Sequence, residues 1–104
     1  MVRHVLLVQM DTAKANDLVR SGKLGETIGT ILAEQKPEAV YFTELDGVRT
    51  GIMIIDIAAE SDIPQIAEPW FLALDAKLSF RPAMVPADLE AAGPAFAAAV
   101  KTYG

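Results

Sequence analysis

The hydrophobic pattern is most informative at residues 51–57 (GIMIIDI), where apolar residues occupy odd and even positions alike. Successive side chains of a β-strand point to opposite faces, so this strand needs an apolar cover on each face. A chain of 104 residues can back one face of a sheet with its own helices, which leaves the other face open. We therefore predict a homodimer in which the open faces of two sheets pack together.

The rest of the pattern predicts strands and helices in alternation. Strands are expected at residues 2–10, 39–45, 48–57 and 77–84, and helices at 13–36, 61–74 and after Pro86. Gly22 and Gly25 should divide the first helical region into two short pieces, and Pro69 should break or kink the second. Asp46-Gly47 is typical of a two-residue hairpin turn, which predicts that the second and third strands are antiparallel neighbours.

This hairpin register sorts the side chains of the sheet into two sets. The wholly apolar set is assigned to the helices and comprises Val40, Phe42, Met53, Ile55 and Ile57. The other set is assigned to the dimer interior and comprises Tyr41, Thr43, Ile52, Ile54 and Asp56, with Lys77, Ser79 and Arg81 of the fourth strand. Val5, Leu7 and Gln9 join this second set if the first strand has the matching phase. Near the turn, Glu44 faces Arg49 and should form a weak cross-strand ion pair.

Length and composition narrow the class of protein. The 104 residues predict one domain spanning 1–104. The net charge of −5, with Lys and Arg scattered along the chain, argues against a nucleic-acid partner. The absence of cysteine fits a reducing compartment, and no apolar run has the length of a signal or membrane segment. We expect a cytoplasmic protein with no membrane partner.

The order strand, helix, strand, strand, helix, strand is the ferredoxin-like arrangement, here with an added C-terminal helix. With a sheet apolar on both faces, the chain resembles the dimeric α+β barrel superfamily, which includes muconolactone isomerases and cofactor-independent monooxygenases. The segments YFTE (41–44), GVRT (47–50), IPQIAEP (63–69) and PADL (86–89) are similar to a small uncharacterised bacterial group within it. The resemblance implies an α+β fold that pairs as a homodimer around a shared interior.

Candidate ligand-binding residues lie on the interior face: Gln9, Tyr41, Ile52, Ile54, Ser79 and Arg81. In the arrangement that the resemblance implies, the first and third strands are expected to run parallel. Gln9 and Asp56 would then share one end of the sheet, with Ser79 close by. Asp56 is a candidate general base; alternatively it is solvated at the strand's end, or pairs with Arg81 or Lys77.

His4 is the chain's single histidine and the second candidate base, or else an edge residue of the first strand. It has no partner at metal-ligand spacing, so we predict no metal, and no motif indicates a cofactor.

Two functions follow from these residues. The first is a homodimer that binds a small, largely apolar organic ligand between its sheets. The alternative is a cofactor-independent isomerase or monooxygenase acting on a small acidic or phenolic molecule, with Asp56 or His4 as base and Arg81 holding an anion. A third possibility is a structural dimer with a solid interface.

Overall fold

A four-stranded antiparallel sheet and five helices make up the computed structural model, which describes residues 2–104. The elements are β1 (Val2–Gln9), α1 (Thr12–Arg20), α2 (Leu24–Gln35), β2 (Ala39–Leu45), β3 (Val48–Ile57), α3 (Asp62–Leu74), β4 (Lys77–Pro82), α4 (Pro86–Ala91) and α5 (Gly93–Tyr103). The strand order in the sheet is β2-β3-β1-β4, with each neighbouring pair antiparallel. This is the ferredoxin-like arrangement with a C-terminal helical extension, and the predicted fold class is confirmed.

The β2–β3 hairpin has the predicted register. Tyr41 lies opposite Ile52, and the strands are joined at Asp46 and Gly47, whose φ angles are 55° and 77°. Two successive positive φ angles are those of a type I′ turn, which matches the twist of the flanking strands. The predicted Glu44–Arg49 ion pair is wrong. Glu44 instead accepts a hydrogen bond from the Gly47 N–H at 2.7 Å, and Arg49 Nη1 donates to Asn16 Oδ1 at 2.9 Å.

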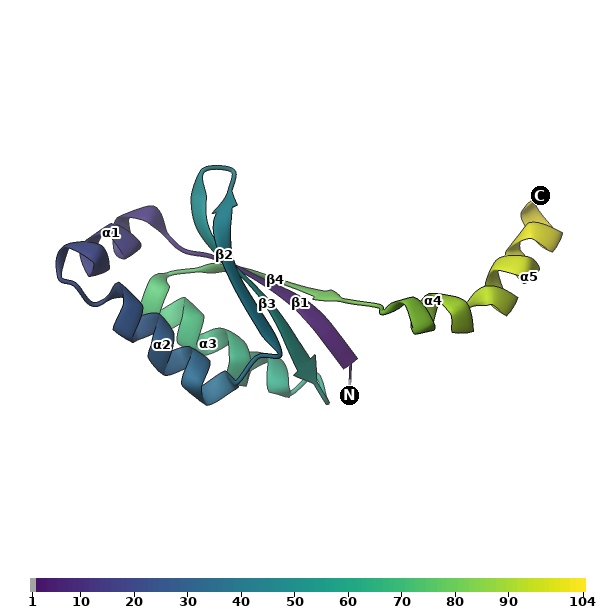
Figure 1. Cartoon of the computed structure of the whole chain (residues 1–104), viewed down its shortest axis with the longest axis horizontal. Helices are drawn as coiled ribbons and strands as arrows, with labels where there is room; N and C mark the ends of the chain where they lie inside the picture. The colour runs from purple at the N-terminus through teal and green to yellow at the C-terminus, as the bar shows by residue number, and fades with distance from the viewer. Residues whose placement is uncertain (1) are drawn as a thin grey trace.

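Helices α2 and α3 lie side by side over one face of the sheet and form the core with it (Figure 1). The largest fully buried side chain is Trp70 of α3, whose Nε1–H donates to Gln35 Oε1 at 3.0 Å. Helix α3 continues through Pro69, so the predicted break at that residue does not occur. The strand residues assigned to the helices from the sequence do face them. Met53, Ile55 and Ile57 are buried there together with Leu6 and Val8.

Helices α4 and α5, residues 86–103, project from the sheet as an arm (Figure 1). The arm gives the chain extents of 60 × 28 × 20 Å and a radius of gyration of 17.4 Å. A compact domain of this length has a radius of gyration of about 13 Å. Neither arm helix contains a buried residue. None of the helices within residues 2–104 combines the length and apolar character that a membrane crossing needs.

Candidate functional site

The sheet face turned away from α2 and α3 carries the residues that the sequence assigned to an interior. We call it the open face. The strand pairing arranges its side chains in three rows across β2, β3, β1 and β4. The rows are Ala39-Ile54-Val5-Arg81, Tyr41-Ile52-Leu7-Ser79 and Thr43-Thr50-Gln9-Lys77. Val5, Leu7 and Gln9 therefore share this face with Ile52 and Ile54, which settles the phase of the first strand.

The centre of the open face is apolar and its margin is polar. Four half-buried aliphatic side chains meet at the centre: Val5, Leu7, Ile52 and Ile54. Tyr41 flanks them on β2 with 67 % of its surface exposed, and Ser79 and Arg81 flank them on β4. A mostly apolar surface with a few convergent polar groups has the composition of a small-molecule site. All six predicted ligand-binding residues thus share one face of the sheet.

The prediction that Gln9 and Asp56 share one end of the sheet is wrong, because β1 runs antiparallel to β3 and not parallel to it. Gln9 is paired with Thr50 at one end of the sheet, whereas Asp56 is paired with Arg3 at the other. Ser79 is in the middle row beside Leu7, one row from Gln9 and two rows from Asp56, so it is near Gln9 alone. The reason is topological. The helical crossover makes β2 run in the same direction as β1, and the hairpin then returns β3 in the opposite direction between them.

Asp56 lies at the edge of the open face, next to the last residue of β3, and its side chain is exposed. Its cross-strand neighbour Arg3 is held by Glu38, with Arg3 Nη2 at 2.9 Å from Glu38 Oε1. The side-chain ion pairs within residues 2–104 are Arg3–Glu38 and Arg20–Asp17. Asp56 is therefore solvated in the single chain, and neither of the suggested pairs with Arg81 or Lys77 is present among these residues.

The carboxylates near Arg3 all raise the pKa of its guanidinium group. The hydrogen bonds and the charge of Glu38 raise the pKa of the Arg3 guanidinium above its usual value, and the carboxylates of Asp56 and Asp88 add to this effect. Arg3 thus remains a cation, and its own partner is Glu38. Arg3, which is already paired with Glu38, is the cross-strand neighbour of Asp56 at this end of the open face.

His4 lies on the other face of the sheet, in phase with Leu6 and Val8, and is paired with Ile55 and Pro82. Its Nδ1 is 3.1 Å from the carbonyl oxygen of Val2, an exposed local contact near the chain's start. The two candidate bases therefore face opposite sides of the sheet and do not share a site. Within residues 2–104 no group of three His, Asp or Glu side chains is placed to hold a metal ion.

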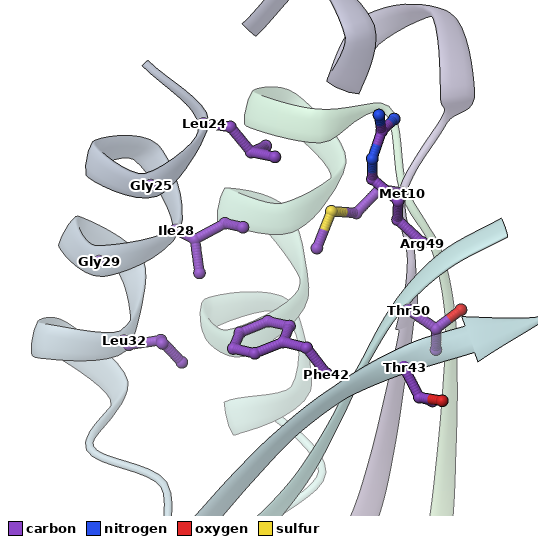
Figure 2. Close-up of a pocket in the computed structure, with 10 residues that line it drawn as sticks. All are labelled: Met10, Leu24, Gly25, Ile28, Gly29, Leu32, Phe42, Thr43, Arg49 and Thr50. Carbon is purple, nitrogen blue, oxygen red and sulfur yellow. The ribbon is translucent and has the colours of Figure 1, made fainter. Parts of the chain in front are cut away.

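A groove that the sequence did not reveal lies on the helix side of the sheet, between α2 and the β2–β3 hairpin (Figure 2). It has a volume of about 440 Å³. Its lining residues are Met10, Leu24, Gly25, Ile28, Gly29, Leu32, Phe42, Thr43, Arg49 and Thr50. We call this the α2 groove. The feature of the sequence that marks this groove is the pair Gly25 and Gly29. Helix α2 is continuous through both glycines.

The α2 groove is almost wholly apolar. The Phe42 ring projects from β2 toward Ile28 and remains 54 % exposed. Thr43 and Thr50 belong to the rows of the open face, and their hydroxyl groups point away from the groove (Figure 2). Arg49 is the charged member of the lining. A polar ligand would find few partners here, which distinguishes this groove from the open face.

Comparisons with known proteins add little to this description. No protein-family model matches the chain, and no curated protein matches it. Among solved structures, the chain is similar to the de novo designed protein Ferredog-Diesel, with a TM-score of 0.42 and 15 % sequence identity over 78 % of this chain and 84 % of the designed one. The fold assignment therefore rests on the strand order and pairing.

Proposed function

We propose that the protein is a homodimer that holds a small, largely apolar organic molecule between the open faces of its two sheets. The supporting observation is the aliphatic patch at the centre of the open face, formed by Val5, Leu7, Ile52 and Ile54. Apolar surface gains about 25 cal/mol per Å² when it leaves water, and the single chain has no helix over this patch. A second sheet provides the cover, and a ligand occupies the space that the side chains leave.

The polar margin suggests the chemistry of the ligand. Arg81 offers a planar set of donors suited to a carboxylate, and Tyr41 and Ser79 offer hydroxyl groups on either side of the patch. An aromatic or aliphatic organic acid would place its apolar body on Ile52 and Leu7 and its anionic group at Arg81. This ligand class accounts for both the apolar centre and the cation at its edge.

Native mass spectrometry of the purified protein, compared with its denatured mass, tests the proposal directly. The expected result is a dimer, with extra small-molecule mass where a ligand has co-purified. A protein that is monomeric at micromolar concentration contradicts the proposal, because the open face then functions without a partner.

The location of the ligand site is tested with the fluorescent probe 1-anilinonaphthalene-8-sulfonate, an apolar aromatic anion. Arg81→Ala should weaken its binding roughly tenfold, as expected for the loss of a charge-assisted hydrogen bond. Arg49→Ala is the matched control, because Arg49 lines the α2 groove. If Arg49→Ala weakens probe binding and Arg81→Ala does not, the site is in the groove and the proposal is wrong.

The alternative function is a cofactor-independent isomerase or monooxygenase with Asp56 as base and Arg81 as the anion-binding group. It is favoured by one observation: both side chains lie on the open face, and neither takes part in the ion pairs found within residues 2–104. As an isomerase, Asp56 would remove a proton from one substrate carbon and return it to another. The monooxygenase version needs dioxygen as co-substrate. His4 has no part in either, since it lies on the other face.

Deuterium exchange separates the alternative from simple binding. Small phenolic and enol acids are incubated with the protein in D₂O, and C–H exchange is followed by NMR. An enzyme of this kind exchanges a substrate proton, and Asp56→Asn abolishes the exchange while the dimer remains intact. Binding without exchange, unaffected by Asp56→Asn, removes Asp56 from the chemistry.

A further inference from the structure

The arm carries an apolar stripe that nothing in its own chain covers. Phe96, Val100 and Tyr103 are spaced i, i+4 and i+7 along α5, so they lie on one face of the helix. Their exposed fractions are 57 %, 65 % and 88 %. An eleven-residue helix of this kind gains most of its stability from packing an apolar face against something else. The stripe therefore needs a partner surface.

The α2 groove has the properties of such a surface. Its walls are the aliphatic side chains of Leu24, Ile28 and Leu32 on one side and the ring of Phe42 on the other. A Cβ atom built on Gly25 or Gly29 would meet nothing within 4 Å, so the α2 backbone is open to close approach. Each glycine within a helix lowers its stability by roughly 0.5–1 kcal/mol relative to alanine, so the two glycines that leave this space open also destabilise α2.

We propose that α5 of one chain docks in the α2 groove of a second copy, and that the exchange is reciprocal. Phe96, Val100 and Tyr103 would pack against Ile28, Leu32 and Phe42 of the second chain. The inference rests on the second copy invoked in the proposed function, and it does not depend on a ligand between the sheets.

The chain's own geometry directs the arm to another molecule. The arm leaves the sheet after Pro82 of β4, which is paired with His4 of β1, whereas the groove lies beside Met10 and β2. Strands β2 and β4 are opposite edges of the sheet, so these two points are at diagonal corners about 25 Å apart, from strand rise and spacing. Residues 83–85 and α4 together span about 20 Å. The direct path over the helix face is occupied by α3 (Figure 1).

A two-fold axis parallel to the strands removes this obstacle. It places the β4 edge of one chain over the β2 edge of the other. In the single chain the arm points away from the end of the sheet at which the groove lies (Figure 1), so docking requires the arm to turn back at residues 83–85 and follow this edge for about 20 Å.

The area involved suits a stable dimer. A covered Phe or Tyr buries about 150–250 Å², so Phe96 and Tyr103 with the surface they cover, counted for both arms, bury on the order of 1,200 Å². This is the lower limit for a specific interface, before any contact between the sheets is added.

Disulfide trapping between separately mutated chains tests the contact, and the absence of native cysteine makes it clean. Chains carrying Val100→Cys are mixed with chains carrying Gly29→Cys and are oxidised. Denaturing and native mass spectra of the same sample then give the cross-link and the assembly. The expected product is a disulfide between the two chains. Ala98→Cys, on the opposite side of α5, is the matched control and should cross-link far less.

The outcomes separate this inference from the proposed function. A native dimer in which Val100→Cys and Ala98→Cys behave alike overturns the arm contact and leaves the paired sheets standing. A monomer overturns both. A disulfide that forms within single chains of the Gly29→Cys/Val100→Cys double variant shows the arm folding back on its own groove, which also overturns the exchange.

A second measurement does not depend on disulfide geometry. Val100→Asp should raise the dimer dissociation constant at least tenfold, because it places a charge in an apolar contact, whereas Ala98→Asp should leave it within about twofold. Equal effects of the two variants would count against a specific docking of this helix face.

Discussion

Phe42 lies directly across the hairpin from Gly51, and its ring occupies part of the space that a side chain at position 51 would need. A Cβ atom at Gly51 would lie 3.4 Å from Phe42 Cε1 and 3.0 Å from Met53 Cε. Gly51 is thus the residue that leaves room for the Phe42 ring, which forms one wall of the α2 groove.

Gly51→Ala should lower the free energy of unfolding by about 1 kcal/mol, measured by urea denaturation. Met53 is fully buried, so its methyl group must move within a packed core, and overpacking of this kind costs about 1–3 kcal/mol. The gain from reducing the freedom of the unfolded chain, about 0.4–1 kcal/mol, offsets part of it. In a Met53→Leu background the added methyl should cost less, and a cost that is unchanged would show that the Met53 contact is not its origin.

The buried indole of Trp70 depends on one side chain of a different helix. Gln35 accepts from Trp70 Nε1–H at 3.0 Å and donates through Nε2 to the carbonyl oxygen of Ile66 at 2.8 Å, which ties α2 to α3. Gln35→Leu leaves the buried N–H without a partner, so the free energy of unfolding should fall by about 1–3 kcal/mol. The emission of Trp70, the single tryptophan, reports the unfolding transition.

A second variant isolates the hydrogen bond from the packing. Trp70→Phe removes the indole N–H, so Gln35→Leu should be markedly less costly in the Trp70→Phe protein, followed by circular dichroism. Additive costs in the double variant would mean that the destabilisation comes from lost packing around Gln35.

The sequence predicted the sheet well because its signals are local. The Asp46-Gly47 dipeptide determines the turn, the turn determines the register from Ala39↔Ile54 to Leu45↔Val48, and the register assigns every side chain of β2 and β3 to a face. The same reasoning identified the open face through Ile52, Ile54 and Tyr41. These inferences use alternation of two residues, which does not depend on tertiary contacts.

The errors about the candidate site concern relations between distant segments. The direction of β1 relative to β3 depends on the crossover through α1 and α2, which separated Gln9 from Asp56. The phase of β1 was open because its residues are apolar on both faces, and this left His4 undetermined until its strand pairing was known. The α2 groove forms where α2 and β2 diverge, and no residue pattern within one segment describes the distance between two elements.

The hairpin turn makes a prediction about backbone conformation. Gly47 has a φ of 77°, a left-handed conformation that costs a residue with a side chain roughly 1–2 kcal/mol. Gly47→Ala should therefore destabilise the protein by about that amount, measured by thermal unfolding. Asp46→Gly is the control. Asp46 already adopts a strained positive φ of 55°, and glycine adopts such an angle without strain. Asp46→Gly should therefore lower the stability by under about 1 kcal/mol or leave it unchanged. A larger loss at Asp46 would mean that its carboxylate has a role in the turn.

The apolar centre of the open face gives the last prediction. Ile52 is half-buried between Tyr41 and Leu7 on a face that the single chain leaves uncovered. In one chain a lysine at this position can extend its ammonium group into water, so Ile52→Lys should fold with an unchanged circular dichroism spectrum. Between two packed sheets the same charge is buried and unpaired, which costs several kcal/mol.

Ile52→Lys should therefore raise the dimer dissociation constant by on the order of a hundredfold, measured by sedimentation velocity over a dilution series. Val19→Lys is the matched control, because Val19 is 50 % exposed on α1, away from the sheet, and its replacement should leave the constant unchanged. If Ile52→Lys dimerises as tightly as the unmodified protein, the open faces do not meet. Any dimer would then have to be held by the arms alone, and Val100→Asp should abolish it.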